Sequence, residues 1–339
     1  MSPFPARRII GIVALLVLAS SMGFAQAPPA VRWDELTSAA LARLDRARTV
    51  VLAPAGIVEA HGTLLPNGTE VVINERIAVE LADSIAARTG WAVVILPTIP
   101  LGTGAFDRRG GQGGVGGTLS VRAATVQAVF SDIADNLGQQ GFRFVFVVSG
   151  HADANHDRAL DLAGEHFAAS FRGTMVHLLG RRGCHADDLG PPPITLFSAA
   201  AMTADADSPN GGTLETSRAM WVRPDLVDTV AVRRASDVTI IGAAGASRPR
   251  ARGEWPGFVG APRFATLELG AWLFATQLRA CTSLAIRLLD GLDERTVLRI
   301  ADQRRADPAR RAELDADARR EAGEGPGRRR DAAPAPTRP

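Results

Sequence analysis

The chain has 339 residues and 38 basic side chains, all of them Arg, because the sequence holds no Lys; it also holds no Tyr. These absences exclude nucleotide-binding loops that need a Lys, Schiff-base enzymes, Ser-Lys dyads and a Tyr general acid. The formal net charge is +2, and residues 26–302 carry 26 Arg against 29 acidic residues. A slightly acidic body argues against a nucleic-acid partner.

The N-terminus has the pattern of an export signal. Arg7-Arg8 supplies a positive region, Ile9–Leu18 is apolar, and Ser20–Ala25 ends in small residues. Even extended to Ala25, the apolar run is about 17 residues, shorter than the roughly 20 that span a bilayer, which favours cleavage over a membrane anchor. We therefore expect residues 1–25 to be a signal peptide and the mature protein to be periplasmic or secreted, without a stable membrane anchor.

The rest of the chain divides into a globular body and a charged tail. Residues 26–302 have an ordinary globular composition and are expected to form one catalytic domain. Residues 303–339 are rich in Arg, Ala, Asp and Glu, and they are expected to be a frayed helix followed by disorder. Export would place Cys184 and Cys281 in an oxidising compartment, where they could pair, although two free buried thiols fit the sequence equally well.

Short β-rich runs alternate with helical stretches along the body. Strands are predicted at Thr49–Ala53, Ala92–Leu96, Phe144–Val148 and Thr174–Leu179. Helices are predicted at Val71–Thr89, Arg122–Leu137, Asn155–Phe167 and Ala265–Leu289. Continuous apolar strands alternating with helices predict an α/β fold, a three-layer α/β/α sandwich with a mostly parallel sheet. Ligands of such sheets bind beyond the carboxyl ends of the strands.

Two of the predicted strands are followed by pairs of potential metal ligands. Glu59 and His61 follow the first strand, and His151 and Asp153 follow the third. Residues i and i+2 of an extended chain point to the same side, so each pair can face one site. Glu70 follows at the start of the next helix. Mixed imidazole and carboxylate ligands suit Zn or Mn, and two such ions would activate water for hydrolysis without Lys or Tyr.

A series of short motifs surrounds these residues. In chain order they are Glu59–Gly62, Leu65-Pro66, Thr69-Glu70, Gly117–Ser120, Gly141–Arg143, Ser149–His151, Leu214–Ser217 and Pro224–Val227. Together they resemble the creatininase family, over about residues 50–289.

The resemblance implies a three-layer α/β amidohydrolase for small amides, with two divalent ions (Zn, Mn or both) and often a homo-hexameric assembly. By position, Glu59 and His151 would bind one ion, His61 and Asp153 the other, and Glu70 would bridge them. Glu215 and Asp153 are the candidate catalytic carboxylates, Glu215 as a proton shuttle.

Several positions depart from the family pattern. The family usually has Asp at the position of Glu70 and a second His at that of Leu64, and creatininase itself has Glu at that of Asp153. Asn210 stands where His-Ala-Gly is usual, and Ala152 stands where creatininase has a Tyr. The last two differences argue against creatinine as the substrate.

Other interpretations remain open. A secreted binding protein that keeps the fold without catalysis would account for the departures. Gly111–Gly116 matches a dinucleotide-binding pattern but does not directly follow a strand. Asp153 could instead cap a helix beginning at Asn155, and Glu215 could serve helix initiation.

The remaining histidines and three aspartates are expected to be ordinary. His156 is five residues after His151 and would face away from it on a helix. The other members of the set have no partner at ligand spacing or are expected to be solvated: His166, His177, His185, Asp157, Asp205 and Asp207.

Overall fold

The computed structural model describes residues 30–104, 116–205, 210–238 and 256–321. Four sequence-based expectations lie outside these residues: the signal peptide at 1–25, most of the glycine pattern at 111–116, Asp207, and the tail beyond residue 321.

Five strands form one parallel sheet in the order β1-β3-β2-β4-β5. They are β1 (Val31–Arg32), β2 (Thr49–Pro54), β3 (Ala92–Ile95), β4 (Phe144–Val148) and β5 (Thr174–His177). In the register of the three central strands, Val51 of β2 pairs with Val94 of β3 on one side and with Val145 of β4 on the other. The four predicted strands are confirmed, and β1 was missed because two residues are too few to give a pattern.

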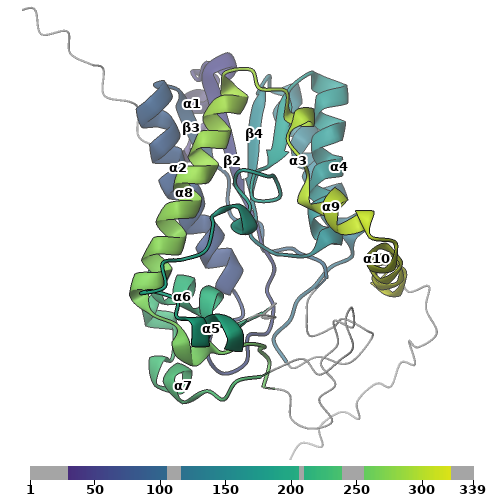
Figure 1. Ribbon diagram of the computed structural model, residues 1–339. Coiled ribbons are helices and arrows are strands. Elements are labelled where there is room, and N and C mark those ends of the chain that lie inside the picture. Colours follow the sequence, from purple (N-terminus) through teal and green to yellow (C-terminus); the bar gives the residue numbers. More distant parts are fainter. Residues whose placement is uncertain (1–29, 105–115, 206–209, 239–255, 322–339) are drawn as a thin grey trace, which may run out of the picture.

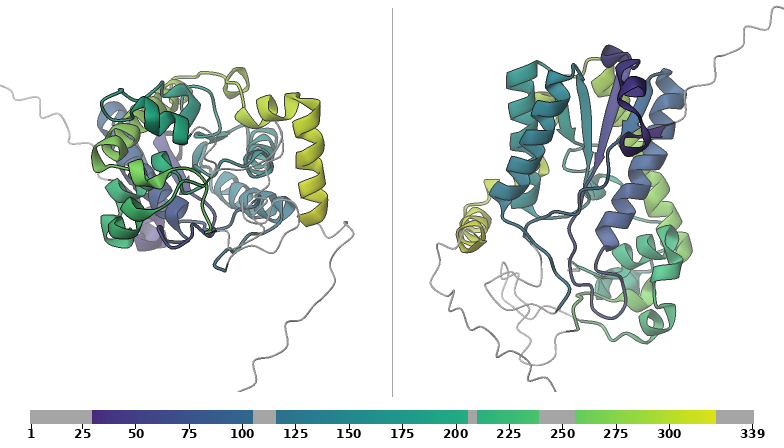
Figure 2. Two further views of the ribbon diagram at one scale, coloured as in Figure 1. Left: turned by 60° about the horizontal axis from the view of Figure 1, so that its bottom comes forward. Right: turned by 180° about the vertical axis from the view of Figure 1, so that it is seen from behind.

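Helices cover both faces of the sheet (Figures 1 and 2). α2 (Thr69–Thr89) and α8 (Leu267–Leu289) lie on one face, and α3 (Ala123–Gln139) and α4 (Ala154–Phe171) lie on the other. The three-layer α/β/α sandwich is therefore confirmed. Because both faces of the strands are buried, the strands read as continuous apolar runs.

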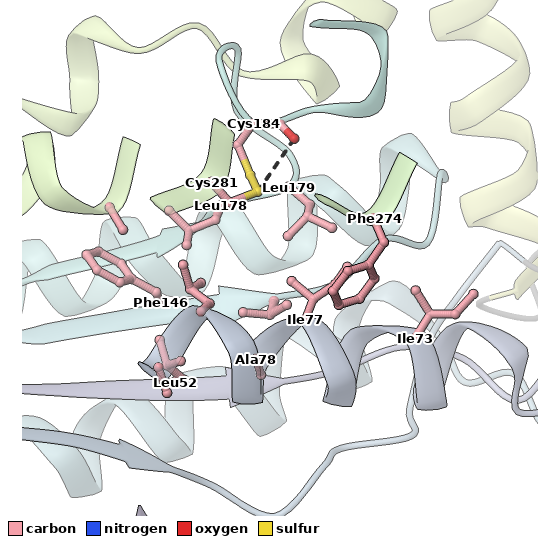
Figure 3. Close-up of a cluster of buried hydrophobic side chains, with 14 of the residues drawn as sticks. Leu52, Ile73, Ile77, Ala78, Phe146, Leu178, Leu179, Cys184, Phe274 and Cys281 are labelled. Carbon is pink, nitrogen blue, oxygen red and sulfur yellow. Dashed lines mark hydrogen bonds between the residues drawn. A yellow bond between two sulfur atoms is a disulfide. The ribbon is translucent and has the colours of Figure 1, made fainter. Parts of the chain in front are cut away.

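Alternate residues of each strand pack against opposite helical layers. Leu52 and Phe146 belong to the cluster formed with α2 and α8, which also contains Ile77 and Phe274 (Figure 3). Val51 belongs to the second cluster, formed with α3 and α4. Each such fully buried apolar side chain contributes about 1.5–3 kcal/mol to folding, so the clusters hold the strand ends, and the loops that follow them, in place.

A disulfide joins Cys184, in the loop after β5, to Cys281 of α8, with 4.6 Å between their Cα atoms (Figure 3). The structure therefore has the paired form of the two thiols. The bond ties the loop after β5 to the helical layer of α8.

Shorter helices complete the body. α1 (Ser38–Ala42) precedes β2. Beyond the carboxyl ends of the strands lie α5 (Ala199–Ala204), α6 (Thr213–Val222) and α7 (Thr229–Arg234), at the bottom of Figure 1. Among the described residues, no helix is long and apolar enough to span a bilayer.

The segment after residue 302 is helical as far as residue 321, where the described part of the chain ends. α9 (Ile300–Ala306) and α10 (Pro308–Glu321) are helical, and both contact α4. Leu314 is buried, its carbonyl accepts a hydrogen bond from Asn155 Nδ2, and Arg305 Nη1 donates to Asn155 Oδ1. Polar contacts with α4, and a few apolar side chains, therefore hold this segment against the body.

Candidate metal centre

The loop after β2 carries Glu59 and His61 and is held by two other segments. Ala60 N–H donates to Thr118 Oγ1 at 3.0 Å, and Asn210 Nδ2 donates to the Ala60 carbonyl at 3.1 Å. Asn210, which departs from the family pattern, therefore fixes the backbone between the two candidate ligands.

Gly62 ends this turn in a conformation that requires glycine. Its φ is +68°, and a Cβ there would lie 2.2 Å from the Pro256 carbonyl oxygen. The close approach of the two backbones sets the direction in which the loop leaves His61.

Three predicted ligands converge at the carboxyl edge of the sheet. His151 Nδ1, after β4, lies 2.9 Å from Glu70 Oε1 in the first turn of α2 and 3.8 Å from Glu59 Oε2. One ligand atom from each residue lies within 4.8 Å of the other two, a grouping that could hold a metal ion. All three side chains are largely buried.

His61 and Glu215 form a second contact beside this group. His61 Nε2 lies 3.3 Å from Glu215 Oε1 of α6, while Glu215 Oε2 accepts a hydrogen bond from Gly211 N–H at 2.7 Å. Glu215 thus serves the start of α6 and also faces His61. Burial alone would raise the pKa of Glu215, but the His61 imidazole, the Gly211 N–H and the charge of Arg218 together lower it.

Both imidazoles are oriented in the same way. His151 Nε2 lies 2.8 Å from the Thr103 carbonyl, and His61 Nδ1 lies 2.8 Å from the Glu59 carbonyl. When one ring nitrogen donates to a backbone carbonyl, the other nitrogen is available as a metal ligand, and here it faces carboxylates in both rings. Among the described residues, His61 Nε2 and Glu70 Oε2 are buried without a hydrogen-bond partner.

The electrostatics of the cluster favour a bound cation. Burial by itself lowers the pKa of each imidazole, but the neighbouring carboxylates outweigh it and raise the pKa of both to about 10. For His61 the main carboxylate is Glu215, and for His151 it is Glu70. The cluster therefore holds excess negative charge that protons or divalent ions would neutralise, so the residues fit a metal centre.

Asp153 is held next to the cluster as the N-cap of α4. Its Oδ1 accepts hydrogen bonds from the N–H groups of Asn155 at 2.9 Å and His156 at 3.0 Å. Neither Asp153 nor His61 belongs to the three-residue group, so their assignment to a second ion stays a prediction.

A pocket of about 320 Å³ opens beside these residues. Its metal-centre side includes Glu70, His151 and Glu215. Its other side chains include several that the sequence did not single out as functional: Asp157, His185, Arg218, Gln277 and Arg304. A volume of this size suits a small molecule.

The expectation for His156 was wrong. Its ring packs edge-on against that of His151, with 5.1 Å between centroids and 79° between planes. Helical spacing did not apply, because α4 begins only at Ala154 and His151 lies in the loop before it. Burial is the largest effect that holds the pKa of His156 well below its ordinary value.

Two aspartates expected to be solvated are buried instead. Burial raises the pKa of Asp157 to about 8, with Arg304 opposing the shift, and Asp157 lines the pocket. Asp205 accepts hydrogen bonds from the backbone N–H groups of Thr213 and Ala261. Asp157 and Asp161 are four residues apart and lie on one face of α4, but this spacing does not tell a buried face from an exposed one.

The other histidines have varied surroundings. His166 pairs with Asp135 at 2.6 Å on the surface, and His177 Nε2 lies 2.8 Å from the Ser149 carbonyl in the interior. His185 lines the pocket, so the expectation that it is ordinary missed its position.

Comparisons with known proteins agree with this fold. The family model described as "Creatininase: Creatinine amidohydrolase" matches residues 34–285. The creatinine amidohydrolase of Pseudomonas putida is 25% identical over 192 residues, which cover 55% of this chain and 69% of that protein.

Solved structures share the fold. One described as "Creatininase Mn" matches with a TM-score of 0.58 and 20% identity, over 77% of this chain and 99% of its own. A mutant creatininase of "Zn-Zn type" matches with a TM-score of 0.59 and 21% identity, over 76% of this chain and 98% of its own. The match of the family model over most of the folded body shows that this chain belongs to the creatininase family.

Proposed function

We propose that the protein is an exported, metal-dependent amidohydrolase that cleaves a C–N amide bond in a small molecule. The observation that carries the proposal is the convergence of Glu59, Glu70 and His151, of which Glu70 and His151 line a pocket. Family membership supports the same reaction class, and the relatives with Mn or Zn in their descriptions support these metals.

In the proposed arrangement, Glu59, Glu70 and His151 would hold a divalent ion, and His61 and Asp153 would contribute to holding a second one. Bound there, such ions would lower the pKa of water and polarise the amide carbonyl. The elements of water are then divided between the two products: hydroxyl adds to the carbonyl carbon, the C–N bond breaks, and a proton reaches the leaving nitrogen.

The chain's own groups would orient the reaction and move the proton. Glu215 Oε2 accepts a hydrogen bond from the Gly211 N–H, Oε1 faces His61, and the residue lines the pocket. This carboxylate is therefore the candidate to carry the proton to the leaving nitrogen. The backbone acceptors of Thr103 and Glu59 hold the two imidazoles in one orientation each.

Metal analysis of the full chain tests this function. We expect about two divalent ions per chain after supply of Zn or Mn, lost from Glu59→Gln and His151→Ala and retained by the surface variant His166→Ala. A single ion per chain would remove the second site from the proposal. A wild-type protein that stays metal-free when supplied with both metals would overturn it.

Hydrolysis of a panel of cyclic and linear amides, followed by release of amine, tests the reaction itself. Metal binding without turnover of any amide would favour the alternative of a secreted binding protein. We do not expect creatinine to be the substrate, because Asn210 is engaged with the Ala60 and Gly257 carbonyls and Ala152 offers no hydroxyl.

Export is supported by the N-terminal sequence pattern and by the Cys184–Cys281 disulfide, since such bonds persist in oxidising compartments. Mass spectrometry of the protein from periplasmic and culture fractions should find a mature N-terminus near Gln26. We further propose a homo-oligomer, for which light scattering would give the number of chains.

A further inference from the structure

Two arginines line the pocket beside the metal-centre residues, and neither belongs to the predicted machinery. Arg218 lies on α6, one turn after Glu215, and Arg304 lies on α9. Arg304 stands beyond residue 285, where the match to the family ends. The C-terminal segment therefore adds a positive charge to a pocket whose other walls come from the matched part of the chain.

Both guanidinium groups have buried nitrogen atoms that lack a hydrogen-bond partner among the described residues. These atoms are Nε of Arg218 and Nη1 of Arg304. Arg304 Nη1 forms an ion pair with Asp157 Oδ2 at 3.6 Å, a distance too long for a hydrogen bond. Buried charged donors left without acceptors are costly, so acceptors supplied by a ligand would be strongly favoured.

Most of the acidic groups that line the pocket are engaged elsewhere. Glu70 lies against His151, and Glu215 faces His61 and caps α6. Asp205 accepts hydrogen bonds from the backbone N–H groups of Thr213, at the start of α6, and Ala261. Asp157 forms an ion pair with Arg304, and Glu215 interacts electrostatically with Arg218, but neither carboxylate accepts a hydrogen bond from the two buried nitrogen atoms. These two N–H groups therefore remain available to the oxygen atoms of an anionic ligand.

We propose that Arg218 and Arg304 bind a carboxylate of the substrate, so that the protein acts on small amides that carry a carboxylate group apart from the scissile bond. Guanidinium groups are well suited to carboxylates, because their N–H donors match the two oxygen atoms. In a pocket of about 320 Å³, the amide would lie toward Glu70 and His151 and the carboxylate toward the two arginines. This inference rests on the proposed function for the amide, but carboxylate binding is measurable without hydrolysis.

Calorimetric titration of the metal-loaded full chain with matched ligand pairs tests the proposal. The pairs are hydantoin-5-acetate with hydantoin-5-acetamide, and N-acetyl-β-alanine with its carboxamide. We expect at least one carboxylate to bind about tenfold or more tightly than its uncharged partner. We expect Arg218→Gln and Arg304→Gln each to weaken carboxylate binding about 10- to 100-fold, the range of a charged hydrogen bond, with little effect on the carboxamide.

Control variants separate local from general effects of charge. Arg223→Gln and Arg310→Gln remove exposed arginines that do not line the pocket and should leave the preference for carboxylate unchanged. Arg218→Lys keeps the positive charge and should retain part of that preference. Circular dichroism and metal content check that each variant is folded and loaded.

Three outcomes would overturn the proposal. The first is that no carboxylate binds at millimolar concentration, and the second is that both members of each pair bind equally. The third is that carboxylate binding survives both Gln variants but is lost when the metal is removed. The last result would show that the metal holds the carboxylate. Arginine-dependent binding without cleavage of any amide would instead support this carboxylate site and count against the proposed hydrolysis. Hydrolysis of amides without a preference for carboxylates would support the proposed hydrolysis and contradict the carboxylate site.

Discussion

Glu70 and His151 are in contact across the carboxyl edge of the sheet, with Oε1 and Nδ1 2.9 Å apart although 81 residues separate them in the chain. The contact joins the first turn of α2 to the loop after β4. It places a carboxylate and an imidazole where Glu59 completes a candidate metal group.

Removal of metal should destabilise the wild-type protein and leave Glu70→Gln almost unaffected. A ligand present at about 100 times its Kd stabilises the native state by about 2.7 kcal/mol, so a chelator should lower Tm by several degrees. Thermal unfolding with and without chelator measures this. As a control, Glu80→Gln, on an exposed part of α2, should respond to the chelator like the wild type. If Glu70→Gln also responded like the wild type, the role of Glu70 as a metal ligand would be contradicted.

The metal-free protein should lose stability as the pH rises above neutrality. The folded-state pKa of His61 and His151 is about 10, above the ordinary 6.5, so their contribution is fully present below about pH 6.5 and is lost as the pH rises through 10. Each group can change the free energy of unfolding by up to about 1.4 kcal/mol per pH unit in this window.

Urea unfolding in chelator at pH 7 and pH 9.5 measures this loss of stability. His151→Gln should reduce the dependence on pH, whereas His166→Gln should not. A wild-type protein that is equally stable at both pH values would contradict the assigned direction. Because metal must displace these protons, its affinity should rise with pH.

Gly62→Ala should be more damaging than Gly90→Ala. Both glycines have a φ of +68°, so both variants incur the backbone strain of about 1–2 kcal/mol. A Cβ at Gly62 would also meet the Pro256 carbonyl at 2.2 Å, whereas a Cβ at Gly90 would meet nothing within 4 Å. Urea unfolding should show a larger loss of stability for Gly62→Ala than for Gly90→Ala, and metal analysis should show weaker metal binding for Gly62→Ala only. Equal effects of the two variants would show that the contact with Pro256 is relaxed at little cost.

Loss of the disulfide should lower the free energy of unfolding by about 2–4 kcal/mol. Cys184 and Cys281 are 97 residues apart, so the bond restricts a long segment of the unfolded chain. The double variant Cys184→Ala/Cys281→Ala and the wild type in reductant should show similar losses in denaturant unfolding. Reductant should not affect the double variant, and two titratable thiols in the untreated wild type would contradict the bond.

The fold and part of the candidate site were predictable because their causes are local. The apolar runs after Arg48 and Arg143 predicted buried strands, and ligand pairs directly after two of them predicted a metal centre at the sheet edge. The contact of Glu70 with His151 agrees with this prediction. The packing of α9 and α10 against α4 was not predictable, since these helices are held by polar contacts such as that of Arg305 with Asn155.

The sequence by itself determined the layers, the parallel sheet, the family and the residue types available for chemistry, with neither Lys nor Tyr among them. Periodicity and motif order carry that information within short stretches of chain. Only the tertiary structure decided that His156 packs against His151, that Asp157 is buried, and that Arg218 and Arg304 line one pocket. Those relationships depend on how helices distant in the chain approach one another, and no local pattern of residues encodes that approach.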